Sequence, residues 1–166
     1  MDYKKINRRN FIKQSALASA SLTFMSSRIS ASTKKFPNLR LGVIGTGLRG
    51  QWMTNLCLLR NDVDIKAICD IDSEMINKTL NIIKKAGGKP PDVYKNGQHD
   101  FLNLVQRDDL DAVYIATPWE WHHPMAVAAM KQGKHVGVEC PAALKIKDLW
   151  DLVNVSEKEE KHCMLM

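Results

Sequence analysis

The chain has 166 residues, with 24 Lys and Arg against 18 Asp and Glu, and a formal net charge of +6. Residues 1–31 hold six basic groups and one acid, so the other 135 residues carry 18 basic and 17 acidic side chains and are nearly neutral. Without a basic run to follow a phosphate backbone, nucleic acid is excluded as a partner. The neutral part is long enough for one domain with its own core, but too short for a two-domain dinucleotide-dependent enzyme.

Residues 1–31 are typical of an export signal. A basic stretch that contains Arg8 and Arg9 precedes a weakly apolar run over 15–25, and small residues at 29–31 form a cleavage site. The stretch resembles a twin-arginine signal, which implies the twin-arginine export machinery as a partner and a periplasmic or secreted bacterial protein. A basic amphipathic helix is the alternative. The apolar run is too short and too polar to cross about 30 Å of hydrocarbon, so we expect no stable membrane anchor.

After a linker over residues 32–38, strand and helix patterns alternate along the rest of the chain, residues 39–166. In chain order, we expect a strand at Leu39–Ile44, a helix at Leu48–Leu59, a strand at Val63–Cys69, a helix at Ser73–Lys85, a strand at Val93–Tyr94, a helix at Asp100–Gln106, a strand at Ala112–Ala116, a helix at Pro124–Gln132, a strand at His135–Val138, a helix at Ile146–Lys158 and a strand beginning at Cys163–Met166. Repeated strand-helix-strand units predict an α/β fold, a doubly wound parallel sheet of the Rossmann type.

Several residues give finer expectations about these elements. Ser73 is the expected N-cap of its helix, and Pro124 is expected to open the next long one. The last helix is expected to place four large apolar residues on one face: Ile146, Leu149, Trp150 and Val153. The four cysteines, Cys57, Cys69, Cys140 and Cys163, have no C-x-x-C spacing and are expected to be free thiols.

A glycine-rich motif, G-T-G-L-R-G at residues 45–50, lies between the first expected strand and helix. There Gly45 allows a tight turn, Gly47 lets a pyrophosphate approach the backbone, and Gly50 allows close packing, while the helix N-terminus offers N–H groups to the anion. Asp70 ends the second strand, where a carboxylate can bind the ribose hydroxyls of a dinucleotide. Asp70 would repel a 2′-phosphate, so the motif predicts NAD rather than NADP. A glycine turn followed by a surface Asp is the alternative.

A second cluster, Thr117 to His122, follows the fourth strand, and ligands of open α/β sheets bind beyond such strand ends. Its two tryptophans are expected either to anchor the core or to form flat walls beside a nicotinamide or a sugar ring. His122 and His123 are adjacent in sequence and cannot form an i, i+4 metal pair, and we expect no metal site. We predict that His122 is a hydrogen-bonded loop histidine, with a catalytic role as the alternative.

The third motif, Glu139-Cys140-Pro141, follows the fifth strand. Together with the glycine motif, Asp70 and the Thr117 cluster, it resembles the N-terminal domain of the Gfo/Idh/MocA family of NAD(P)-dependent oxidoreductases. In most of that family the middle residue of the third motif is a catalytic Lys. Cys140 supplies no cation there, and we interpret its thiol as a small apolar substitute rather than a nucleophile.

Within that family, the signal, the Trp-rich cluster and the non-lysine residue resemble glycoside hydrolase family 109, NAD-dependent α-N-acetylgalactosaminidases. The resemblance implies hydrolysis of a terminal α-N-acetylgalactosamine glycan by transient NAD-mediated oxidation and elimination, with NAD retained. With the glycine motif, it predicts cofactor contacts at Gly45, Gly47, Leu48, Arg49, Gly50, Asp70, Thr117, Trp119, Glu120, Trp121, His122, Glu139 and Cys140.

The resemblance also implies a second, α+β substrate domain that this chain lacks, with the catalytic base downstream of Met166. We therefore expect an N-terminal fragment, inactive alone, whose oligomerisation would depend on the missing domain. Two alternatives are an NAD-dependent sugar or inositol oxidoreductase of the same family and a non-catalytic nucleotide-binding fragment.

Overall fold

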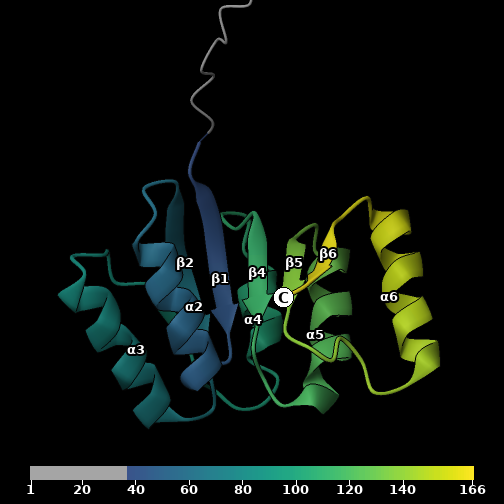
Figure 1. Ribbon diagram of the computed structural model, residues 1–166, viewed down its shortest axis with the longest axis horizontal. Coiled ribbons are helices and arrows are strands. Elements are labelled where there is room, and N and C mark those ends of the chain that lie inside the picture. Colours follow the sequence, from purple (N-terminus) through teal and green to yellow (C-terminus); the bar gives the residue numbers. More distant parts are fainter. Residues whose placement is uncertain (1–36) are drawn as a thin grey trace, which may run out of the picture. The chain divides into compact units, whose positions relative to one another are not determined.

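A computed structural model describes residues 37–166 of the chain (Figure 1). The predicted export signal and most of the predicted linker lie outside the described residues. Within the described part, every helix is too short or too polar to cross a membrane. The described residues form one six-stranded parallel sheet in the order β3-β2-β1-β4-β5-β6. This is the strand order of the dinucleotide-binding Rossmann fold, and it confirms the predicted doubly wound sheet.

The six strands are β1 (Leu39–Ile44), β2 (Val63–Cys69), β3 (Asp92–Tyr94), β4 (Ala112–Ile115), β5 (His135–Val138) and β6 (Cys163–Leu165). The five helices are α2 (Leu48–Leu58), α3 (Ser73–Lys85), α4 (Phe101–Val105), α5 (Trp119–Lys131) and α6 (Ile146–Glu159). All predicted elements are present, and apart from the start of α5 their ends differ from the predicted ones by no more than one residue.

The sheet buries apolar side chains on both faces, and each face has its own core. The larger core packs α4, α5 and α6 on one face of the sheet through side chains such as Ile44, Ile115 and Val138. The smaller core packs α2 and α3 on the other face, where Val43 and Tyr114 lie. Because successive side chains of a strand point to opposite faces, neighbours such as Val43 and Ile44 belong to different cores. A parallel sheet covered in this way leaves its strand ends as the place for a ligand.

Two predictions about helix starts are wrong. The N-cap of α3 is Asp72 rather than Ser73, since the Asp72 carboxylate accepts hydrogen bonds from the N–H groups of Glu74 and Met75. Helix α5 begins at Trp119, five residues before Pro124, so the Thr117 cluster is partly helical and not a loop. Pro124 lies inside the helix, where it has no N–H to donate to the carbonyl one turn earlier.

The large apolar residues of α6 share one face as predicted, but that face does not pack on the sheet. Ile146 is 76% exposed and Trp150 is 64% exposed. The buried residues of α6 are Leu152 and Val155, which lie on the opposite side of the helix. Helix α6 therefore has two apolar sides, and periodicity alone identified the solvent-facing one.

Candidate functional site

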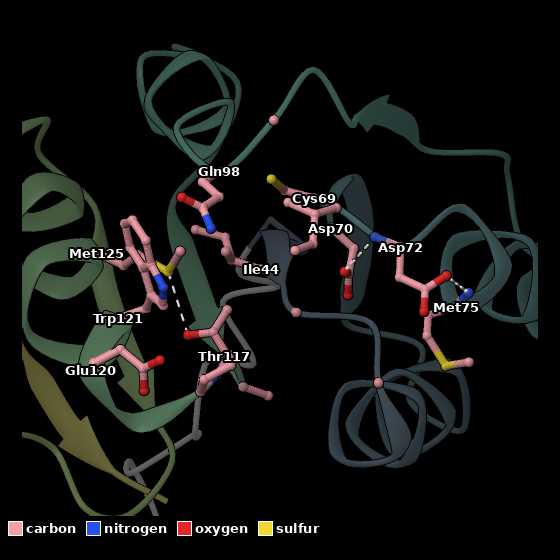
Figure 2. Close-up of a pocket in the computed structure, with 16 residues that line it drawn as sticks. Ile44, Cys69, Asp70, Asp72, Met75, Gln98, Thr117, Glu120, Trp121 and Met125 are labelled. Atoms are coloured by element: carbon pink, nitrogen blue, oxygen red, sulfur yellow. Dashed lines mark hydrogen bonds between the residues drawn. The ribbon is translucent and has the colours of Figure 1, made fainter.

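A cavity of about 410 Å³ opens at the carboxyl ends of β1, β2 and β4. The strand order reverses between β1 and β4, and ligands of doubly wound sheets bind at this switch point. Figure 2 shows two sides of the cavity: Asp70, Asp72 and Met75 on one, and Thr117, Glu120 and Trp121 on the other. The volume is in the range of pockets that bind small molecules and cofactors.

The glycine motif forms the turn from β1 into α2 and has little room for side chains. Gly45 has φ +90°, and a Cβ there would lie 2.5 Å from the Ala116 carbonyl oxygen. A Cβ at Gly50 would lie 1.9 Å from the Gly45 carbonyl oxygen, so Gly50 packs against the loop itself more closely than against the sheet. Gly47 differs, because a Cβ there would meet no atom within 4 Å and the residue lines the cavity.

The N-terminus of α2 has the features of an anion site. Its N-cap, Gly47, provides no side-chain cap, and no acidic residue lies in the first turn. The first N–H groups of the helix are therefore left for a ligand, and the helix dipole favours a negative charge there. A dinucleotide pyrophosphate fits this combination of an open glycine and uncapped N–H groups.

Asp70 lies at the cavity edge, held by the glycine loop. One carboxylate oxygen, Oδ2, accepts hydrogen bonds from the N–H and the hydroxyl of Thr46, the latter at 2.9 Å. The other, Oδ1, accepts one from the N–H of Asp72 at 3.0 Å. A carboxylate has about four acceptor positions, so these three donors fix its orientation and leave one for a ribose hydroxyl. None of the described residues that line the cavity is Lys or Arg, which leaves a 2′-phosphate without a counter-charge.

The other side of the cavity comes from the start of α5. Trp121 packs edge-on against His99 and Phe101, with ring centroids 5.6 and 6.2 Å away, and it lines the cavity beside Glu120. Trp119 is 59% exposed and does not line it. Trp121 therefore fulfils both predicted roles, since it packs on the core and forms a flat wall of the cavity. Trp119 fulfils neither and lies at the surface.

His122 is 1% exposed and connects two loops of the site. Its Nδ1 lies 2.8 Å from the carbonyl oxygen of Pro141, and its Nε2 lies 2.8 Å from that of Thr117. Carbonyl oxygens only accept, so both contacts are hydrogen bonds only when the ring carries both protons. With both nitrogens on the main chain, His122 has none left for a substrate, and it ties the loop after β4 to the loop after β5.

Glu139 and Arg49 form an ion pair beside the cavity. The Arg49 Nε donates to Glu139 Oε1 at 2.8 Å, and its guanidinium lies over the Trp52 ring, 4.4 Å from the centroid. The hydrogen bond to Glu139, more than any other contact, raises the pKa of Arg49. The next residue, Cys140, is exposed, and its thiol supplies no positive charge at the position where most of the resembled family has a lysine.

The structure therefore divides the predicted cofactor residues into two groups. Those that line the cavity are Gly45, Gly47, Asp70, Thr117, Glu120 and Trp121. Those that lie outside its lining are Leu48, Arg49, Gly50, Trp119, His122, Glu139 and Cys140.

Sequence reasoning missed several residues that line the cavity. Met75 lies in the first turn of α3, Gln98 follows β3, and Met125 belongs to the second turn of α5. The position of Gln98 after a strand end was a signal that could have identified it. Cys69 also lines the cavity, and burial, more than the nearby carboxylates, raises its pKa to about 12, which keeps it a thiol.

The chain is similar to known proteins in sequence and in fold. Residues 39–166 match the model of a family described as an oxidoreductase family with an NAD-binding Rossmann fold. A glycosyl hydrolase family 109 protein of Saccharopolyspora erythraea is 48% identical over 126 residues, which cover 76% of this chain and 28% of that protein. Another of the same name, from Solibacter usitatus, is 42% identical over 96% of this chain and 38% of its own length.

Among solved structures, an apo scyllo-inositol dehydrogenase from Lactobacillus casei matches with a TM-score of 0.66 and 23% identity, over 78% of this chain and 36% of that one. At this identity the likeness concerns the fold alone. The chain thus spans between 28% and 38% of the length of the two hydrolase relatives described above.

Proposed function

The chain belongs to the Gfo/Idh/MocA oxidoreductase family, with its NAD-binding Rossmann fold, and we propose that it is the cofactor domain of an NAD-dependent glycoside hydrolase. The substrate we propose is a glycan with a terminal α-N-acetylgalactosamine. One observation carries the proposal: the 48% identity to a glycosyl hydrolase family 109 protein. Cys140 supports it, since a thiol cannot supply the cation that a lysine places beside a reacting hydroxyl in a dehydrogenase.

The residues of the cavity have separate tasks in this proposal. The N–H groups at the start of α2 bind the pyrophosphate of NAD, and the open position at Gly47 lets it approach. Asp70 accepts from a ribose hydroxyl. Trp121 and Glu120 bound the other half of the cavity, where the nicotinamide would lie. When bound, NAD supplies reversible hydride transfer, the chemistry needed to oxidise the sugar hydroxyl transiently.

No catalytic base is assigned among residues 37–166. His122 was the candidate from sequence, and both its nitrogens contact main-chain carbonyls. The task proposed for His122 is to hold the loops after β4 and β5 at a fixed separation.

The test of this function is a comparison of two products in one reaction. The whole protein that carries this chain is supplied with an aryl α-N-acetylgalactosaminide, and the released aryl alcohol and NADH are measured together. We expect aryl alcohol without net NADH, because the hydride returns to the sugar. Net NADH from a free sugar or inositol, without glycoside cleavage, would establish the oxidoreductase alternative. NAD binding with neither product would establish a non-catalytic nucleotide-binding protein.

We also propose that the protein is exported in folded form by the twin-arginine route. The support is the Arg8-Arg9 pattern of the sequence. A folded reporter fused after residue 36 should reach the periplasm, and replacing both arginines with lysine should keep it in the cytoplasm. Export of the lysine variant by the same amount would contradict the proposal.

A further inference from the structure

A buried tyrosine lies under the ion pair beside the cavity. Tyr114 is on β4, is 3% exposed, and donates its hydroxyl proton to Glu139 Oε1. The same oxygen accepts from Arg49 Nε at 2.8 Å. One carboxylate oxygen thus joins β4, the end of β5 and the first turn of α2.

The sheet register explains how Tyr114 reaches Glu139. Tyr114 pairs with Gly137 on β5, and Glu139, two residues further along, projects from the same face of the sheet. The Tyr114 ring lies over Gly137, because a Cβ at Gly137 would be in ordinary van der Waals contact with Tyr114 Cδ2, at 3.7 Å. The phenol can therefore lie along β5 and place its hydroxyl at the Glu139 carboxylate.

Tyr114 is a permanent donor in this arrangement. Burial, above all, and then the hydrogen bond to Glu139 raise the pKa of the Tyr114 hydroxyl, so that it stays protonated. The Glu139 side chain is only 12% exposed, and a polar group so poorly hydrated is stabilised by hydrogen-bond donors from the protein. Both donors from the described residues bind Oε1, and none of them binds Oε2.

We propose that Tyr114 is a positioning residue for the nicotinamide half of the cofactor site, acting through Glu139. By holding Oε1, it fixes the Glu139 carboxylate with Oε2 available to a ligand. The glycine loop and Asp70 bind the ADP half on the β1 and β2 side, whereas Glu139 lies on the β5 side. Tyr114 therefore influences one half of the dinucleotide and not the other. This inference rests on the proposed cofactor site.

The test compares NAD with ADP as ligands of the full chain by calorimetry. Tyr114→Phe removes the hydroxyl and keeps the ring, and we expect NAD affinity to fall about three- to tenfold while ADP affinity stays within twofold. The matched control is Tyr94→Phe, which removes a hydroxyl that contacts Arg107 instead, and it should leave both affinities unchanged. In a Glu139→Gln background, Tyr114→Phe should cause no further loss, because the tyrosine acts through that carboxylate.

Three results would overturn the inference: unchanged NAD affinity in Tyr114→Phe, an equal loss for NAD and ADP, or a full additional loss in the Glu139→Gln background. A measurement made without NAD distinguishes a failure of the Tyr114 inference from a failure of the proposed cofactor site. The NMR signal of the Arg49 Nε–H should move in Tyr114→Phe, since its acceptor is no longer fixed. If that signal moves but the unaltered chain binds no NAD, the contact stands, and both the cofactor site and the positioning role are wrong.

Discussion

Alanine substitutions at two glycines of the same loop should affect different properties: the stability of the fold at Gly50 and the affinity for NAD at Gly47. A Cβ at Gly50 would lie 1.9 Å from the Gly45 carbonyl oxygen, more than 1 Å inside the shortest contact that real Cβ atoms show. The atom that the new Cβ would meet is main chain, and its residue, Gly45, lies so near β4 that a Cβ on it would be 2.5 Å from the Ala116 carbonyl oxygen. We therefore expect Gly50→Ala to lower the free energy of unfolding by about 3 kcal/mol, the upper end of overpacking costs.

Gly47→Ala should instead leave the fold intact. Its backbone, with φ −64° and ψ −167°, is open to any residue, and its Cβ would meet no protein atom within 4 Å. The free energy of unfolding should change by less than about 1 kcal/mol. The methyl group would occupy the space that the pyrophosphate needs. The pyrophosphate would then lose its hydrogen bonds to the helix N–H groups, which should weaken NAD binding about 10- to 100-fold.

Urea unfolding followed by circular dichroism and calorimetric titration with NAD measure the two effects separately. The reasoning predicts that Gly50→Ala loses stability and that Gly47→Ala loses only affinity. It would be refuted by a Gly47→Ala variant that binds NAD as well as the original chain, or by a Gly50→Ala variant of unchanged stability.

Three further changes test other parts of the account. Asp70→Ala should weaken NAD binding about tenfold and leave NADP binding undiminished, which competition titrations with both nucleotides can measure. Arg40 lowers the pKa of Asp111 to about 2, so Asp111→Asn should cost about 1 kcal/mol at neutral pH, allowing for solvent screening of this half-exposed pair. Because the folded-state pKa is depressed, the difference should disappear in urea titrations as the pH falls from about 4 through 2. Trp150→Gln should change stability by less than about 0.5 kcal/mol, whereas Leu152→Ala, on the buried side of the same helix, should cost about 2 kcal/mol or more in thermal unfolding.

Sequence patterns predicted β4 well because a buried parallel strand reads as a short, continuous apolar run. The start of α5 was missed because Pro124 is a strong local signal for a first turn, while Pro118, with its extended backbone, is the actual N-cap. On α6, periodicity showed which residues share a face but not which face meets the sheet, since both sides are apolar.

The cofactor loop was predictable because its glycines and Asp70 have fixed spacing in one strand-helix-strand unit. The contact of Tyr114 with Glu139 was not, because it depends on the register between β4 and β5 and on the direction of a side chain. Only part of the role of His122 could be predicted from the sequence. Its hydrogen bonding was expected, but its two carbonyl partners come from loops 24 residues apart in sequence, Thr117 and Pro141.

The central claim, a hydrolysis that passes through oxidation and elimination, is tested most directly by running the reaction of the whole protein in D₂O. In the proposed reaction the sugar is oxidised at C3, and the ketone formed there acidifies the proton at C2. A base would then remove that proton with loss of the aglycone, and solvent deuterium would take its place when water adds across C1 and C2. We predict that the released N-acetylgalactosamine carries deuterium at C2, as seen by mass spectrometry and NMR. Product formed at full rate with no deuterium at carbon would contradict the account, because direct displacement at C1 leaves the C2 proton untouched.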